Sequence, residues 1–248
     1  MRLLLLFLAL ALPAAAQSVS LSPAVVQFRG APGATSTQTL TLRNGSTVPL
    51  AFDLQAQDVV VRNGKRIFVA AGEVSGGMAR TAVFSAKSVT VPAGEQRSVE
   101  VTVTVPPLMS ERAMVALFRG TTQVRAGNST ATVSLGTLFT LTLGDHVSLA
   151  PSELRVTPQS ASSNASFDLG LANDGEEPVV AKGVAVILDS HGAFSGRVAF
   201  DTRRLLPGEE FNFHAEYPGD LRRGQYRVLS TFEYEGHSLV RSAPLVIR

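Results

Sequence analysis

The chain has 248 residues with no cysteine, no tryptophan and four histidines, and its 22 Lys and Arg residues nearly balance 20 Asp and Glu residues. The absence of cysteine excludes a disulfide scaffold, a thiolate nucleophile and cysteine-ligated metal centres. Hydrophobic residues make up 45% of the chain and charged residues 17%, which is typical of a folded protein with a core. Because one domain usually has about 100 to 150 residues, the length predicts about two domains.

The first sixteen residues have the pattern of a secretory signal. Arg2 is followed by an apolar run from Leu3 to Leu12, and an A-x-A pattern at residues 14–16 precedes Gln17. The apolar run is about half as long as a helix that spans a bilayer. The sequence therefore predicts a signal peptide over residues 1–16 that is cleaved on export. We expect the mature protein to be periplasmic, or secreted to the cell surface, with no transmembrane anchor.

Past the signal, apolar and polar residues alternate with a period of two. This alternation is clear in Leu50–Ala56, in Val99–Val105 and in Tyr226–Glu235, and it is typical of half-buried strands. The pair Asn63-Gly64 separates two apolar runs and predicts a type I′ hairpin, because both central residues of that turn need positive φ. Since no sustained helical period follows Gln17, the mature chain is predicted to be all-β.

Three sequence motifs occur twice in the same order. Each opening strand motif is followed by a strand that ends in Asn and a Gly-containing turn, and then by a Pro-Gly turn. The pairs are VSLSP and VSLAP at residues 19–23 and 147–151, LTLRNGSTVP and LGLANDGEEP at 40–49 and 169–178, and VPAGE and LPGEE at 91–95 and 206–210. The repeat predicts two tandem immunoglobulin-like β-sandwich domains.

We expect the domain boundary near Gly144-Asp145, which gives an N-terminal domain over residues 17–144 and a C-terminal domain over residues 145–248. The first domain has 11 basic and 6 acidic residues, and the second has 10 basic and 14 acidic residues. This difference is either uneven surface decoration or a set of opposed charges that fixes the interdomain angle or steers an acidic partner. The basic residues are scattered, with few aromatic residues between them, so nucleic-acid binding is not indicated.

The N-terminal domain resembles that of the PapD-like periplasmic chaperones. The segments that carry the resemblance are VSLSPAVVQF at residues 19–28, LTLRNGSTVPL at 40–50, SVTVPAGEQRSVEVTV at 88–103 and ERAMVALFR at 111–119. The wider set of two-domain immunoglobulin-like export proteins, including the WxL-interacting family, is similar too. The PapD-like resemblance implies a periplasmic, non-enzymatic protein whose first domain lends a strand of alternating hydrophobicity to a partner subunit.

The last strand expected in the first domain, Thr132–Leu143, fits that role by its pattern. Thr, Ser and Gly dominate one parity. The other parity carries five apolar residues, interrupted by Thr137, which we take as candidate partner-binding residues: Val133, Leu135, Phe139, Leu141 and Leu143. Such a strand either offers its side chains to successive pockets of a partner or fills the domain's own core, which alternation alone would also produce.

Two features of the resembling families are missing. Pilus chaperones hold a subunit's terminal carboxylate with a basic pair from the first and last strands of the N-terminal domain, since paired cations stabilise a partly buried carboxylate. Here Val25 stands at the arginine position, and Thr132–Leu143 contains no lysine; Arg29 is expected in the turn that follows the first strand. The WxL-interacting family ends in a membrane anchor, whereas this chain ends in the strand-like SLVRSAPLVIR.

The second domain contains a structural motif of sandwich domains. Leu221, Gly224 and Tyr226 form an L-x-x-G-x-Y pattern before an alternating strand, which is similar to a tyrosine corner, where the phenol hydrogen-bonds back to the turn.

Enzyme signatures are not found in the sequence. His146, His191, His214 and His237 have no H-x-x-x-H or H-x-H spacing, so the sequence predicts no metal site. No nucleophile elbow, phosphate loop or cofactor motif occurs. The acidic pairs at residues 176–177 and 209–210 lie in expected turns, where we predict solvated charges. We therefore expect a protein that is not an enzyme and binds no cofactor.

These observations favour an exported, chaperone-like or assembly protein that binds an extracytoplasmic protein subunit, fimbrial or on the cell surface, by edge-strand addition. The alternative is a structural or adhesive module that binds a cell-wall polymer or a surface protein through its loops. A third hypothesis, a hydrolase without a recognisable motif, lacks any triad or metal spacing.

Overall fold

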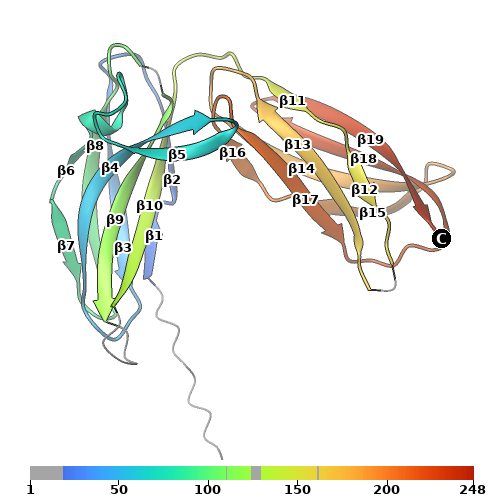
Figure 1. Ribbon diagram of the computed structural model, residues 1–248, viewed down its shortest axis with the longest axis horizontal. Coiled ribbons are helices and arrows are strands. Elements are labelled where there is room, and N and C mark those ends of the chain that lie inside the picture. The colour runs from blue at the N-terminus through green and yellow to red at the C-terminus, as the bar shows by residue number, and fades with distance from the viewer. Residues whose placement is uncertain (1–18, 110, 124–129, 161) are drawn as a thin grey trace, which may run out of the picture.

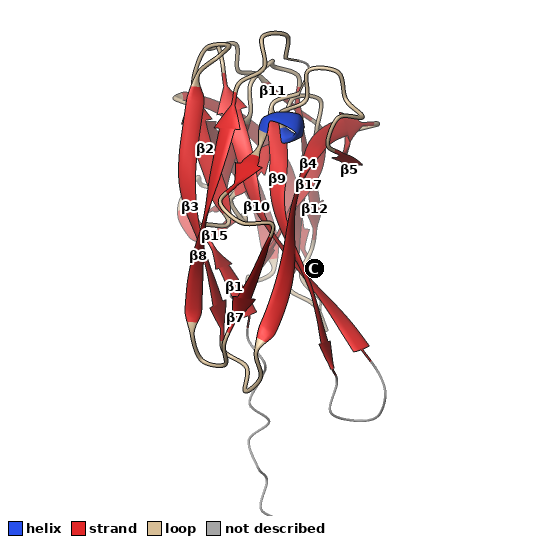
Figure 2. Cartoon of the chain, turned by 90° about the vertical axis from the view of Figure 1, so that its left-hand side faces the viewer, coloured by secondary structure: helices blue, strands red, loops and turns tan. Residues whose placement is uncertain are grey.

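The computed structural model describes residues 19–109, 111–123, 130–160 and 162–248, and the predicted signal peptide lies outside these residues. The described chain folds into two lobes of β-strands that meet at an angle (Figure 1). Its one described helix is the short 3-10 helix η1, Ala79–Thr81, at one end of the first lobe (Figure 2). Among the described residues, no helix is both long and apolar enough to cross a bilayer.

The first lobe, domain 1, consists of two sheets. One has the strand order β1-β3-β8-β6, with bounds Val19–Ser22, Thr35–Asn44, Gln96–Thr104 and Val83–Phe84. The other has the order β2 (Val25–Arg29), β10 (Thr130–Thr142), β9 (Ala113–Gln123), β4 (Leu50–Arg62) and β5 (Lys65–Ala70). Strand β7 (Ser88–Val91) also pairs with β4.

The second lobe, domain 2, repeats the two-sheet plan. In one sheet β13 is flanked by β11, β12 and β17; the bounds of β11, β12, β13 and β17 are Leu149–Pro151, Arg155–Thr157, Ala165–Asn173 and Glu210–Tyr217. The other has the order β15 (Phe194–Ala199), β14 (Val179–Asp189), β18 (Gly224–Tyr234) and β19 (His237–Ile247). Strand β16 (Arg203–Leu205) also pairs with β14. The change from one pair of sheets to the other falls between Thr142 and Leu149, which contains the predicted boundary at Gly144-Asp145.

The predicted hairpin at Asn63-Gly64 is confirmed. It joins β4 to β5, and the two residues have φ angles of 51° and 72°. Both angles lie in the left-handed region that a type I′ turn requires and that Asn and Gly tolerate best.

The internal repeat is visible in two buried asparagines. Asn44 closes β3 and Asn173 closes β13, and their side chains are 0% and 1% exposed. The Asn44 backbone N–H donates to the Glu95 carbonyl, and the Asn173 N–H donates to the Glu209 carbonyl, each at 2.9 Å. Each side-chain amide also donates to backbone carbonyls of two neighbouring segments. The repeated motif therefore makes the same turn in both domains.

Each domain has its own apolar core, as expected for a pair of independent sandwiches. Domain 1 buries Phe52, Phe118 and Phe139 between its sheets. In domain 2, the rings of Phe213 and Phe232 meet edge to face with centroids 4.8 Å apart. These two cores and the four sheets confirm the predicted fold class, an all-β pair of sandwiches.

Candidate protein-binding site

Strand β10 of domain 1 has a neighbour on both sides along only part of its length. On one side it pairs antiparallel with β9 from Thr130 to Thr140. On the other side β2 pairs with it in parallel, but only from Leu138 to Thr142. Upstream of Leu138, no strand of the described chain pairs with this second side. We call the stretch Thr132–Gly136 the open edge of β10.

The change of partner at the open edge follows from the path of the first strand segment. Strand β1 pairs antiparallel with β3 in one sheet, and after Pro23 and Ala24 the chain continues as β2 in the other sheet. The Thr137 hydroxyl donates to the Pro23 carbonyl at 2.7 Å, and the Leu138 N–H donates to the Ala24 carbonyl at 3.0 Å. Because β2 begins here, β10 is uncovered upstream of this point.

The backbone polar groups of the open edge can be assigned by parity. The Leu138 N–H points toward β2, whereas the Leu141 N–H donates toward β9, to the Arg112 carbonyl at 2.9 Å. Since successive residues of a strand direct their N–H and C=O groups to opposite edges, the even-numbered positions face the β2 side. The N–H and C=O groups of Thr132, Ser134 and Gly136 therefore point away from β9, toward an edge that an added strand can pair with.

The five predicted site residues divide into two groups. Phe139 and Leu141 are 0% exposed and belong to the core of domain 1, so the core-filling alternative applies to these two side chains. Val133, Leu135 and Leu143 are half-buried and pack against the same core from its margin. Leu143 lies past the end of β10, which leaves Val133 and Leu135 as the two of the set on the open edge. Binding of a partner by these residues stays a prediction.

Gly136 shapes the other face of the open edge. A Cβ atom at this position would lie 2.7 Å from Cγ2 of Val115 on β9. A side chain here would have to displace Val115, so glycine keeps β10 flat beside β9 without strain in the ladder. The sequence pattern gave no signal for this constraint, which depends on a neighbouring strand.

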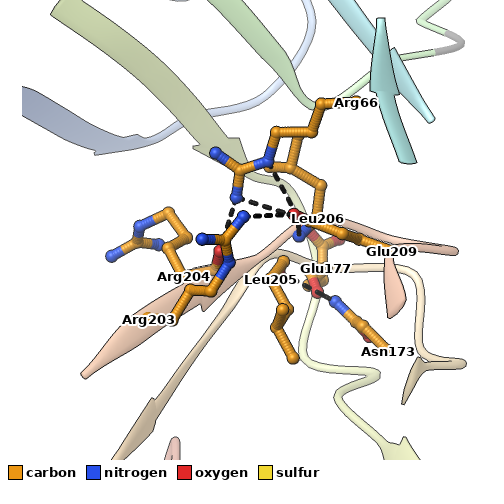
Figure 3. A network of polar contacts seen from close by, with 8 residues as sticks. All are labelled: Arg66, Asn173, Glu177, Arg203, Arg204, Leu205, Leu206 and Glu209. Carbon is orange, nitrogen blue, oxygen red and sulfur yellow. Dashed lines mark hydrogen bonds and ion pairs between the residues drawn. The ribbon is translucent and has the colours of Figure 1, made fainter. Parts of the chain in front are cut away.

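Two buried glutamates of domain 2, Glu177 and Glu209, join it to domain 1, and Figure 3 shows the contact of Glu209 with Arg66. Both oxygens of Glu209 are used: Oε2 accepts from Nε of Arg66 at 2.9 Å, and Oε1 accepts from Nη2 of Arg203 at 3.3 Å. Glu177 lies 3.5 Å from Nε of Arg112, and it accepts backbone N–H bonds from Leu143 and Gly144. The opposed charges of the two domains thus meet in ion pairs across the boundary.

The prediction of solvated charge at residues 176–177 and 209–210 is wrong for one member of each pair. Glu177 and Glu209 are each only 2% exposed, whereas Glu176 and Glu210 are exposed. The reason is the docking of domain 1, which covers these two turns and supplies the arginines and N–H groups that a buried carboxylate needs.

Apolar contacts accompany the ion pairs at the boundary. Leu206 of domain 2 is 2% exposed and packs against Val59, Ala113 and Val115 of domain 1. Ala113 and Val115 lie on β9, the neighbour of β10, and Val59 lies on β4, the next strand along, so the interface holds domain 2 beside the sheet that contains the open edge.

Two carboxyl groups near this boundary have shifted pKa values. Burial raises the pKa of Asp58, against the opposing effect of the hydrogen bond from the Ala79 N–H. Burial also raises the pKa of Glu111, and the nearby charge of Asp58 adds to the rise. The Asp58 side chain is fully buried, and its Oδ1 accepts from the Ala79 N–H at 2.8 Å, which pins η1 against β4.

The structure also shows where the residues lie that stand at or near the positions of the missing basic pair. Val25 is the first residue of β2 and is 43% exposed, beside Leu138. Arg29 was expected in a turn, but it is the last residue of β2, opposite Thr142, because the strand continues through it. Arg112 faces the boundary with Glu177 as its counterion.

The remaining sequence expectations concern domain 2. The Tyr226 hydroxyl donates to the Arg222 carbonyl at 2.8 Å, which confirms the tyrosine corner. Of the four histidines, His214 has the closest carboxylate: its Nδ1 lies 2.9 Å from Oδ1 of Asp168. Over the part of the chain that the structure describes, no three His, Asp or Glu side chains gather as metal ligands.

No family model matches the sequence, and no curated protein matches it. Solved structures do show a likeness. The class 5 fimbriae chaperone CfaA is 13% identical, with 91% of this chain and 98% of that chain covered and a TM-score of 0.48. The E. coli chaperone DraB is 12% identical, with 92% and 98% covered and a TM-score of 0.43.

A third similar structure is a chain of the CsuC-CsuE chaperone-tip adhesion subunit pre-assembly complex from the archaic Csu pili of Acinetobacter baumannii. It is 8% identical, with 92% of this chain and 98% of that chain covered and a TM-score of 0.45. These likenesses concern the fold alone.

Proposed function

We propose that this protein is an exported chaperone-like or assembly protein that binds an extracytoplasmic protein subunit by adding the open edge of β10 to a strand of that subunit. The single observation that carries the proposal is that, within the described residues, no strand pairs with the β2 side of Thr132–Gly136, where the backbone groups of three residues point outward. An unpaired strand edge is a ready template for another chain. The similar structures include a fimbrial chaperone and a chain from a complex of a chaperone with a tip adhesion subunit, which agrees with a fimbrial or surface subunit as the partner.

The side chains of the open edge favour a particular division of roles. Thr132, Ser134 and Gly136 are small and exposed, so they let a partner strand approach closely. Val133 and Leu135 are half-buried over the margin of the core and offer apolar surface to the partner. Phe139 and Leu141 hold β10 in place from within domain 1. We propose main-chain pairing at 132–136, with Val133 and Leu135 as the apolar contacts.

The proposal is tested with a proline at an even-numbered position. Ser134→Pro removes an N–H that points to the open edge and leaves the pairing with β9 intact, because proline is tolerated at an edge where its missing N–H faces solvent. The control variant Thr39→Ala changes an exposed side chain on β3, in the other sheet of domain 1. Each protein is purified from the native host's periplasm with its stoichiometric partner, and the dissociation constant is measured with the purified pair.

We expect Ser134→Pro to keep its folding transition and to bind the partner at least tenfold more weakly, whereas Thr39→Ala should bind as the parent protein does. Equal binding by Ser134→Pro and the parent protein would contradict strand addition at this edge. That result, together with loss of binding on changing loop residues, would favour the adhesive module that recognises a polymer or a surface protein through its loops.

A further inference from the structure

The outward face of the five-stranded sheet in domain 2 is unusually apolar. A sheet that packs one face on a core normally presents polar side chains on the other. Here several apolar side chains lie on the strands β14, β15, β18 and β19 but do not belong to the core of domain 2 or pack against it. They are Val184, Val186, Leu188, Phe194, Leu229, Val240 and Val246.

Register places these side chains next to one another. Val186 on β14 lies opposite Leu229 on β18, and Leu188 lies opposite Phe194 on β15. Val240 on β19 is one strand further along the same face, opposite Thr231. We call this set of side chains the β14–β18 face.

The exposed fractions are high for large apolar residues. Phe194 is 66% exposed, Val240 51% and Val246 44%. Isolated exposed residues need no explanation, but a contiguous apolar patch on several strands of a sheet marks an interaction surface.

Two arginines without an ion pair lie within the same face. Arg197 is opposite Val186, and Arg227 is opposite both Leu188 and Pro244. Both side chains are exposed, and no carboxylate of the described chain lies within ion-pair distance of them. The nearby Asp189 is occupied, since its Oδ1 accepts the N–H groups of His191 and Ala193.

The face also continues into a groove. This groove has a volume of about 820 Å³, and Leu188, Arg227 and Pro244 of the same face line it together with Tyr226 and the turn residue His191. An apolar surface that carries arginines and ends in a groove has the composition of a protein interface core, where aromatic residues and Arg are enriched and Lys and Glu are depleted.

We infer that the β14–β18 face is the docking surface for an acidic, partly apolar segment of a partner protein. Aliphatic side chains of the segment would cover Val186 and Leu229, and its carboxylates would pair with Arg197 and Arg227. Charge complementarity decides the occupant: Arg197 and Arg227 lie among apolar side chains, and a carboxylate beside an apolar side chain satisfies both features. A membrane surface fits less well, since attraction to anionic lipid takes clusters of about four to eight basic residues.

The partner segment covers the face and does not extend the sheet. Strand β19 is the last strand of this sheet, but its C-terminal half contains Pro244, opposite Arg227. Proline lacks an N–H and is confined to edge strands where that group faces solvent, so it removes a donor from the free edge and hinders strand addition. This site is therefore distinct in both chemistry and place from the open edge of β10.

Photocrosslinking within the native host tests the inference. Leu229→p-benzoylphenylalanine places a reactive group on the face, and Thr39→p-benzoylphenylalanine places one on an exposed position of β3 in domain 1. The adduct at 229 is formed in the extracytoplasmic fraction, and the linked peptide is sequenced by mass spectrometry. The same experiment is repeated with Arg197→Glu and Arg227→Glu combined, and with the charge-matched pair Arg43→Glu and Arg80→Glu in domain 1.

We expect a protein adduct at position 229 whose linked peptide carries carboxylates beside apolar residues. Its yield should fall at least fivefold in the Arg197 and Arg227 double variant and stay unchanged in the Arg43 and Arg80 pair. No adduct above the Thr39 level, an adduct with lipid, an adduct with a second copy of this chain, or an adduct indifferent to the arginines would each overturn the inference. Ser134→Pro, added to the parent background, separates the two sites, because it should abolish strand addition and leave a β14–β18 adduct in place.

Discussion

Nε of Arg66 donates a 2.9 Å hydrogen bond to Oε2 of Glu209, and this contact joins the hairpin of domain 1 to a turn of domain 2. The same turn exists in domain 1, where Glu95 occupies the position of Glu209. There, however, Glu95 is exposed and pairs with Arg97, and the two side chains are 51% and 46% exposed. One turn motif thus carries a solvated carboxylate in one domain and an interdomain ion pair in the other.

This pair of turns predicts unequal effects of the same substitution. Glu209→Gln leaves Arg66 and Arg203 without their shared carboxylate and should lower the free energy of unfolding of domain 2 by about 2 kcal/mol, since both arginines are partly solvated. Glu95→Gln should change stability by less than about 0.5 kcal/mol. Urea unfolding followed by circular dichroism measures both. Equal effects would show that the boundary ion pair does not hold the domains together.

The two repeated asparagines predict matched losses in the two domains. Asn44→Ala and Asn173→Ala each leave buried carbonyl groups without a donor, which should cost about 2 to 4 kcal/mol of stability in the domain concerned. Asn212→Ala serves as the control, because that side chain is exposed on β17. Differential scanning calorimetry should show the transition of one domain shifted down while the other stays in place. A shift of the same size for Asn212→Ala would contradict the role of burial.

Substitutions in the two halves of β10 should destabilise domain 1 by different amounts. Phe139→Ala opens a cavity in a fully buried site and should destabilise domain 1 by about 3 to 5 kcal/mol. Leu135→Ala removes a half-buried side chain at the margin and should cost about 1 kcal/mol. Chemical denaturation ranks the two variants. If Leu135→Ala were as destabilising as Phe139→Ala, the open edge would be part of the core and could not serve a partner.

His214 predicts a pH dependence of stability. Its hydrogen bond with Asp168 raises the pKa of His214, and the bond with Glu216 adds to this. The protonated form is therefore favoured in the folded protein, so its stabilising effect is complete below the pKa of the unfolded chain and is lost as the pH rises through the folded pKa. At pH 5.5, the free energy of unfolding of the parent protein should exceed that of His214→Gln by roughly 0.2 to 1 kcal/mol. At pH 8.5, the two free energies of unfolding should be equal. A constant difference between the two pH values would contradict this pairing.

The local features of this fold were accessible from the sequence because they depend on short segments. Alternation gave the strands, Asn63-Gly64 gave a hairpin, and the repeated Asn motif gave two equivalent domains. The burial of Glu177 and Glu209 could not be predicted from the sequence, because it depends on a domain formed by a distant part of the chain. The same limit applies to β10: Leu135 and Phe139 share one parity, and only the point at which β2 begins separates an open edge from a covered one.

Hydrogen–deuterium exchange of single backbone amides, measured by NMR on the mature protein alone and with its purified partner subunit, tests the central claim most directly. In the free protein, the amides of Ser134 and Gly136 should exchange fast, and those of Leu135 and Leu138, bonded to β9 and to Ala24, should exchange slowly. The partner should slow exchange at Ser134 and Gly136 by at least tenfold. Slow exchange at these two amides in the free protein, or fast exchange in the complex, would contradict strand addition at the open edge.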